Sequence, residues 1–257
     1  MSDEQQQPAP EEPPLPPPAP PPERDPFWGW GDVFLFIGLS VASWLVCGLL
    51  ITGVAILARI HVRGEMGTTE LLAAQVIIYA LAFGSLALLF RIQYDRPFWD
   101  SLGWRGFQMP VVQVALLGVG AAYAVSLLGA LIRTPTTPNE ITKLLDDPKS
   151  LILMAVFGVT LAPLCEELAF RGFLQPLLVR SLGVVPGILA AALPFGLLHY
   201  REYGNSLRHA VIVAAAGAAF GWMRHRTGST RASTIMHAAY NALFFAAVAG
   251  QRVHLWR

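Results

Sequence analysis

Long apolar runs separated by short polar segments dominate the chain from residue 33 onwards. A helix needs about 20 apolar residues to cross the hydrocarbon core of a bilayer. The pattern predicts seven spans, at residues 33–58, 71–90, 110–132, 151–180, 184–200, 209–223 and 232–248. We therefore expect an all-α polytopic membrane protein of about seven transmembrane helices, with a polar cavity between the C-terminal helices.

Ionisable residues stand in the middle of the fourth run. Residues 151–165 are apolar but too short to cross a bilayer, and they end at Glu166 and Glu167. Apolar character then continues to Arg180. The pattern predicts one long helix with two carboxylates halfway along it.

Composition supports the membrane class. Hydrophobic residues make up 54% of the chain and charged residues 14%, whereas soluble domains carry about 25% charged residues. The net charge of +1 argues against a nucleic-acid partner, which would require a basic surface.

Four segments follow from these patterns. Residues 1–26 hold 11 prolines and predict a disordered proline-rich tail, passive or a docking element for an unknown protein. Residues 27–144 are N-terminal transmembrane helices, entered past an aromatic belt of Phe27, Trp28 and Trp30. Residues 145–249 form a membrane core, and residues 250–257 form a short C-terminal tail.

The two glutamates are expected to differ in role. Each ionisable group inside a membrane helix costs about 2.5–3.5 kcal/mol on insertion scales. Glu167 and Arg171 are four residues apart and share a helix face, so they can pair. Glu166 points about 100° away and is free to face another group. The alternative is a structural ion pair with one spare carboxylate in a wet crevice.

Helix geometry suggests a partner for Glu166. Glu166 and His199 stand at equal distances from Leu182-Gly183, where the chain should turn. In an antiparallel hairpin both would lie about 24 Å from the turn. We expect their side chains to approach within roughly 3–6 Å and to share a water molecule.

A further helix carries His237 and Asn241, again four residues apart. A carboxylate, two imidazoles and an amide are suited to hydrolysis, because they can activate water and stabilise an oxyanion. The spacing Gly217–Gly221 predicts close helix packing, which we interpret as architecture.

Two other functions remain open. A proton-coupled transporter or channel would use the same groups as a proton relay, but it predicts an inverted repeat that the sequence lacks. A non-catalytic membrane adaptor would use the proline-rich tail for docking.

Three motifs resemble those of one known family. They are Glu166-Glu167-Leu-Ala-Phe-Arg171, Phe195-Gly-Leu-Leu-His199 and His237-Ala-Ala-Tyr-Asn241. They are similar to the E-E-x-x-x-R, F-x-x-x-H and H-x-x-x-N motifs of the CPBP, or Abi, intramembrane proteases, also called type II CAAX prenyl endopeptidases. The resemblance covers about residues 145–249.

The resemblance implies an endopeptidase that processes prenylated CAAX proteins or other membrane peptides. Glu166, Glu167, His199, His237 and Asn241 would form the catalytic site. Within it, Glu166 and His199 would activate water, and His237 and Asn241 would bind the oxyanion or substrate carbonyl. Arg171 and Phe195 would support this catalytic site.

Two further expectations concern the metal and the location. His199, His237 and a glutamate are plausible zinc ligands, so a metalloprotease and a metal-free glutamate mechanism both stay open. The resemblance implies a cytoplasmic N terminus, which a tie in flanking charge does not decide. Arginine outnumbers lysine 16 to 2 and points to a bacterial source, hence to the bacterial inner membrane.

Overall fold

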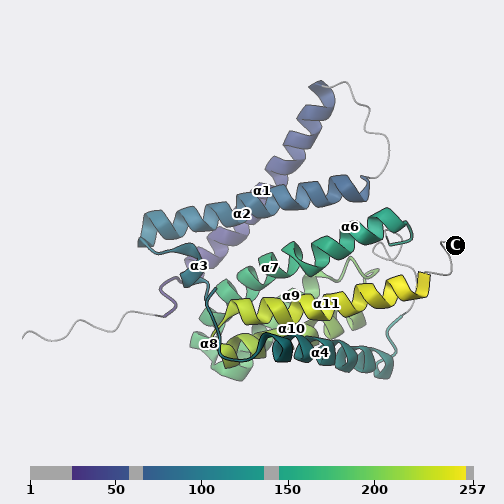
Figure 1. Ribbon diagram of the computed structural model, residues 1–257. Coiled ribbons are helices and arrows are strands. Elements are labelled where there is room, and N and C mark those ends of the chain that lie inside the picture. Colours follow the sequence, from purple (N-terminus) through teal and green to yellow (C-terminus); the bar gives the residue numbers. More distant parts are fainter. Residues whose placement is uncertain (1–24, 58–65, 136–144, 253–257) are drawn as a thin grey trace, which may run out of the picture.

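The computed structural model describes residues 25–57, 66–135 and 145–252. Every regular element in these ranges is helical (Figure 1). Five stretches are long and apolar enough to cross a membrane: Trp30–Leu57 (α1), Thr68–Tyr94 (α2), Val111–Leu131 (α4), Pro148–Leu182 (α6 to α8) and Thr230–Arg252 (α11). The all-α membrane class is confirmed.

The prediction of seven spans is not confirmed. Val184–Leu198 (α9) is apolar but has 15 residues, which span about 22 Å of a core about 30 Å thick. Leu207–Thr227 (α10) carries Arg208 near its start and Arg224 and Arg226 near its end, so the apolar part between them is short.

The fourth span extends over the predicted length but is not a uniform helix. Its parts are Pro148–Val159 (α6), Leu161–Glu167 (α7), the π-helix Leu168–Leu174 (η1) and Gln175–Leu182 (α8). The break falls at Thr160, with φ −118° and ψ −81°. Pro163 has no N–H to donate to the Val159 carbonyl, and this weakens the helix at that point. The glutamates end α7, at the start of the π-helical turn.

The predicted turn between the fourth and fifth runs is confirmed. Gly183 adopts φ +87°, a left-handed conformation that glycine reaches at no steric cost. α8 and α9 then pack as neighbours. A Cβ on Gly187 would stand 2.6 Å from the Val179 backbone, so the hairpin closes only because that position is glycine.

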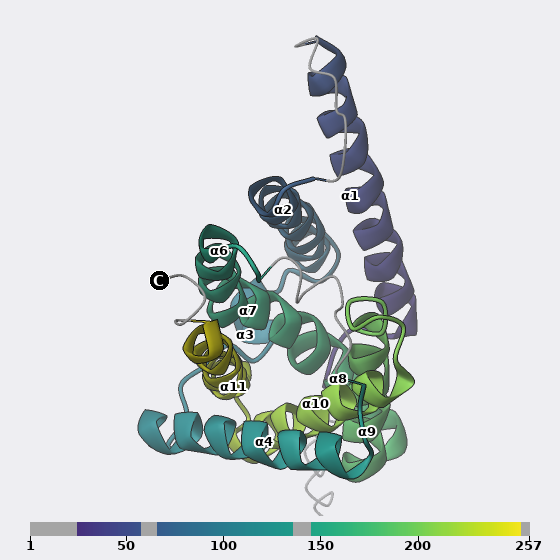
Figure 2. The ribbon, with the colours of Figure 1, turned by 90° about the vertical axis from the view of Figure 1, so that its right-hand side faces the viewer.

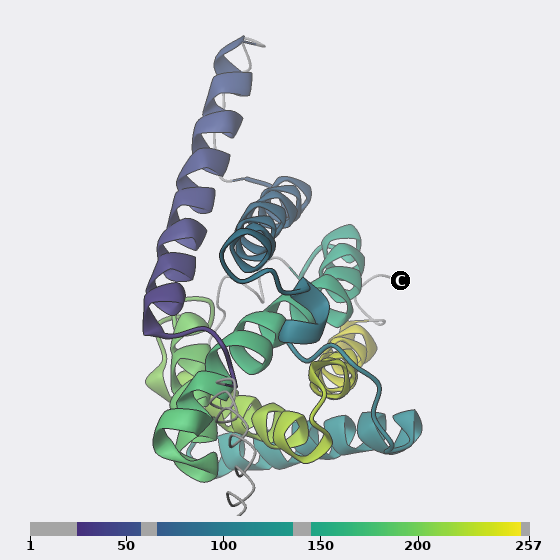
Figure 3. The same cartoon turned by 90° about the vertical axis from the view of Figure 1, so that its left-hand side faces the viewer.

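α11 lies in the middle of the bundle. It packs against α4, α6, α7 and α10, and Figure 2 shows it between α6 and α4. α10 packs along α9. The short helix α3 (Phe98–Ser101) follows α2. α1 stands at the edge of the bundle next to α2 (Figure 3), and its exposed apolar side chains, such as Leu49 and Ile56, suit contact with lipid.

The aromatic residues before α1 divide into two environments. Trp30 is 43% exposed, and its place in an interfacial belt stays a prediction. Trp28 is buried: its indole stacks on Phe90 and Phe173, and Nε1 donates to the Phe173 carbonyl at 3.1 Å. Trp28 therefore attaches the start of α1 to η1. Residues 1–24 lie outside the described ranges, so the tail's disorder and docking role stay predictions.

Candidate active site

A buried ionic cluster lies where η1 meets α11. Glu167 and Arg171 are almost completely buried, and Arg171 Nη1 stands 3.1 Å from Glu167 Oε1. The same Oε1 atom is 3.1 Å from His237 Nδ1 on α11. The predicted Glu167–Arg171 pair is confirmed. Since Glu167 also contacts His237, it joins the two helices that carry the first and third motifs.

Aromatic rings and a backbone carbonyl surround the guanidinium group of Arg171. Nη2 donates to the Gly217 carbonyl at 2.8 Å. The Phe195 ring centre lies 4.3 Å from Arg171 Cζ, with Phe170 and Phe220 at 5.7 and 5.6 Å. A Cβ on Gly217 would stand 2.9 Å from Nη2. The small-residue face of α10 therefore makes room for this charge, a role beyond the predicted helix packing.

The contact with Glu167 orients the imidazole of His237. An ionised carboxylate only accepts hydrogen bonds, so Nδ1 carries a proton, and in the neutral ring Nε2 has a lone pair. The ring stacks on Phe220 with centroids 4.4 Å apart and 18° between the planes. Nε2 then faces Glu166 Oε2 at 3.8 Å.

Glu166 is the accessible carboxylate of the site. Its side chain is 22% exposed, whereas that of Glu167 is 0% exposed. The separation of 3.8 Å from His237 Nε2 is too long for a direct hydrogen bond. A water molecule beside the two groups could bond to both. The two glutamates differ in exposure and in the pairing of Glu167 with Arg171, as predicted, but both face His237.

His199 is the residue that follows the end of α9. Its backbone N–H bonds to the Gly196 carbonyl, which leaves the Phe195 carbonyl free to accept from His199 Nδ1 at 2.8 Å. Because a carbonyl only accepts, Nδ1 of His199 carries a proton, and in the neutral ring Nε2 is an acceptor. Among the described residues the ion-pair contact of Glu166 is to His237 and not to His199. The Glu166–His199 water therefore stays a prediction.

Sequence reasoning missed Glu202, a third carboxylate near these groups. Desolvation raises the pKa of Glu202, the negative charge of Glu166 raises it further, and His199 acts in the opposite direction. The side chain is nevertheless solvent-accessible, and it lies in the loop between α9 and α10. Its distance of three residues from His199 was the signal available in the sequence.

Asn241 connects α11 to the break in the fourth span. Nδ2 donates to the Gly158 carbonyl at 2.7 Å, two residues before the break at Thr160. One amide hydrogen is thereby used, and one remains. The spacing His237–Asn241 places both side chains against the fourth span, His237 at its carboxylates and Asn241 at its break.

Gln175 is a second residue that sequence reasoning missed. It follows Arg171 by four residues and repeats its contact one turn along α10, with Nε2 donating to the Gly221 carbonyl at 2.9 Å. Oε1 of Gln175 is buried without a hydrogen-bond partner in the described structure. The four-residue spacing from Arg171 was the signal in the sequence.

The arrangement does not fit the expected zinc cage. Catalytic zinc takes three protein ligands at about 2.0–2.2 Å. Within the described ranges no three His, Cys, Asp or Glu side chains group closely enough to hold a metal. Nδ1 of His199 bonds to the Phe195 carbonyl, and Nδ1 of His237 bonds to Glu167. The other carboxylate contact of His237, from Nε2 to Glu166 Oε2, is 3.8 Å long.

The fold and site define a polytopic helical membrane protein with a carboxylate–arginine–histidine cluster between its helices. Residues 148–243 match the family model described as type II CAAX prenyl endopeptidase Rce1-like. No curated protein and no solved structure matched the chain. The matched segment contains all three motifs, so the resemblance is confirmed. Over residues 148–243 the chain is similar to intramembrane endopeptidases of the CAAX type.

Proposed function

We propose that this protein hydrolyses a peptide bond with a water molecule held between Glu166 and His237. The observation that carries the proposal is the 3.8 Å gap between Glu166 Oε2 and His237 Nε2, beside a second carboxylate already neutralised by Arg171. Two acceptors facing one position bind the two hydrogens of one water and leave its oxygen lone pairs free to attack.

The reaction follows from these roles. The water oxygen forms a bond to the carbonyl carbon of the substrate while Glu166 takes one proton. The tetrahedral intermediate then collapses, the C–N bond breaks, and Glu166 returns the proton to the leaving amine. Glu167 holds His237 in the required tautomer, and Arg171 keeps Glu167 ionised. The remaining amide hydrogen of Asn241 is the proposed donor to the oxyanion.

The family and the fold support a substrate class. Rce1-like endopeptidases of the CAAX type act on membrane-associated peptide or protein substrates, and the site here lies between spanning helices. We propose a prenylated CAAX-type protein or a comparable membrane peptide as substrate. We also propose a cytoplasmic N terminus, because Arg105, Arg180 and Arg224 lie at the same end of the bundle as Trp30, in line with the positive-inside rule.

Peptide cleavage by the purified full-length chain tests this function. The probe is a farnesylated peptide ending in a CAAX sequence, with its unprenylated form for comparison and mass spectrometry of the products. Glu166→Gln should abolish cleavage, since removing a general base typically costs 10²- to 10⁴-fold in rate. Glu70→Gln is the matched control, because Glu70 is an exposed glutamate at the start of α2. Equal cleavage by wild type and Glu166→Gln would refute the proposal.

A further inference from the structure

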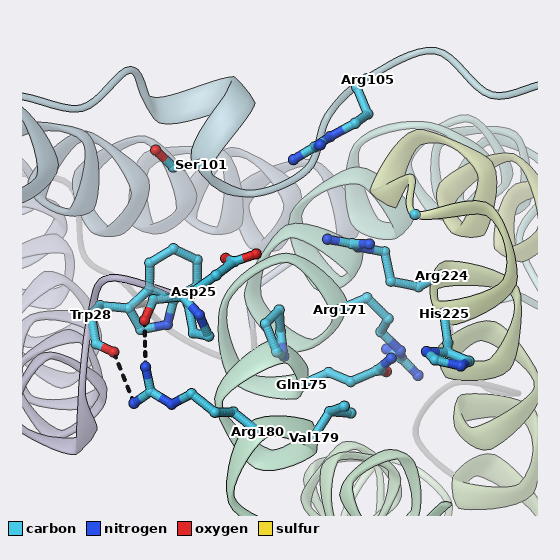
Figure 4. Close-up of a pocket in the computed structure, with 13 residues that line it drawn as sticks. Asp25, Trp28, Ser101, Arg105, Arg171, Gln175, Val179, Arg180, Arg224 and His225 are labelled. Carbon is cyan, nitrogen blue, oxygen red and sulfur yellow. Dashed lines mark hydrogen bonds between the residues drawn. The ribbon is translucent and has the colours of Figure 1, made fainter. Parts of the chain in front are cut away.

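A pocket of about 450 Å³ opens at the end of the bundle where α8 and α10 finish (Figure 4). Arg105, Arg180 and Arg224 come to its walls from three different elements. Arg171 also lines the pocket, but its charge is already balanced by Glu167. Asp25 is the carboxylate residue among the described residues that line it. The positive charge of Arg105, Arg180 and Arg224 therefore exceeds the negative charge of Asp25 by two.

The hydrogen bonds of these arginines go to neutral acceptors. Arg180 donates to the carbonyls of Pro26 and Trp28, and Arg224 Nε donates to Thr230 Oγ1 at 3.0 Å. Arg105 makes a long contact of 3.4 Å to the Asp100 carbonyl. These bonds hold the guanidinium groups in place without neutralising them. Asp25 acts on Arg224, and the positive charge that exceeds Asp25 is available to an anion.

The fold holds Arg105 close to Arg224. Thr230 N and Oγ1 donate to the carbonyls of Gly103 and Leu102, and Ser229 Oγ donates to the Arg105 carbonyl. Arg224 also packs against Gly103, where a side chain would collide with it. Arg105 and Arg224 consequently lie within electrostatic range of each other. Two like charges fixed side by side are favourable when an anion lies between them.

The geometry points to a binding site for a phosphate group, with an anionic phospholipid headgroup as the source that the position favours. Guanidinium groups match phosphate oxygens in a bidentate manner. Arg180 stands in the last turn of the span Pro148–Leu182, at the level where headgroups meet the hydrocarbon core. Trp28 also lines the pocket. This site is separate from Glu166, and it does not depend on the proposed peptidase activity.

Lipid titration of the purified full-length chain in a neutral detergent tests the site. Unfolding temperature and native mass spectrometry are followed as phosphatidylglycerol, phosphatidylcholine or inorganic phosphate is added. The test variant is Arg105→Gln, because this side chain is exposed and its variant should fold. The matched control is Arg226→Gln, an exposed arginine of the same end of the bundle that is not among the pocket-lining residues.

Wild type should bind phosphatidylglycerol saturably and more tightly than phosphatidylcholine. Arg105→Gln should weaken this binding about tenfold, which corresponds to about 1.4 kcal/mol, and Arg226→Gln should leave it unchanged. If binding of inorganic phosphate depends on Arg105 in this way and lipid binding does not, the result would support the phosphate site with a soluble phosphate as its ligand. Equal binding of either ligand by wild type and both variants, or binding of neither, would overturn the proposal.

Discussion

Removing the guanidinium group of Arg171 should destabilise the whole bundle. In wild type the group forms an ion pair with Glu167 at 3.1 Å and donates to the Gly217 carbonyl at 2.8 Å. It also lies over the Phe195 ring at 4.3 Å. Arg171→Ala therefore leaves Glu167 and the Gly217 carbonyl without their partner and also opens a cavity. These changes fall at a position that is 1% exposed in wild type.

The expected magnitude is large for a single substitution. Breaking a buried ion pair by removing one partner costs about 3–5 kcal/mol, mainly because the other charge is left uncompensated. Replacing both partners by apolar residues of similar volume removes that penalty. Arg171→Met combined with Glu167→Met should therefore recover much of the lost stability. Neither Arg171→Ala nor the double substitution restores the orientation of His237. Peptidase activity should therefore stay low in both variants.

Reversible denaturation in mixed detergent micelles, followed by circular dichroism, measures these differences. Glu166→Gln serves as the comparison, because Glu166 is partly exposed and makes no ion pair closer than 3.8 Å. We expect it to change the free energy of unfolding by less than about 1 kcal/mol. Equal losses in Arg171→Ala and Glu166→Gln would refute the division of roles and favour a purely structural ion-pair cluster.

Three further predictions concern the chemistry of the site. Asn241→Ala should cost about 2.7–4 kcal/mol of transition-state stabilisation, the scale of one lost oxyanion donor, measured as a fall in kcat; an unchanged kcat would remove Asn241 from that role. If zinc is bound through His199 and His237, elemental analysis should approach one equivalent and a chelator should abolish cleavage; full activity in metal-depleted protein would exclude a metal requirement. The raised pKa of Glu202 means that it gains its proton as pH falls while ordinary glutamates are still ionised. Glu202→Gln mimics the protonated form, so its kcat/KM should differ from wild type at neutral pH and converge with it in acid, and a ratio constant with pH would contradict this.

Local geometry explains why parts of the site could be predicted from the sequence. The pairing of Glu167 with Arg171 depends on a four-residue spacing within one helix, so it does not require knowledge of any other helix. The turn at Gly183 likewise follows from local residue types. Helical class and approximate span limits follow from hydrophobic runs, because a bilayer excludes unsatisfied backbone groups. These features are properties of contiguous segments.

The partner of Glu166 was decided by tertiary packing. Equal distances from the turn could place His199 at a comparable depth, but they could not show which helix faces the carboxylate. The central position of α11 brings His237 to both glutamates. The break at Thr160 and the π-helical turn after Glu167 also alter the helix face that each side chain occupies.

The sequence by itself determined the membrane class, the location of the motifs and the pairing within the fourth span. Tertiary structure alone decided that Gly217 and Gly221 present their carbonyls to Arg171 and Gln175, and that Arg105 stands beside Arg224. The physical reason is that these contacts join residues 46 or more positions apart. Their geometry depends on how closely whole helices approach, and no local spacing encodes that distance.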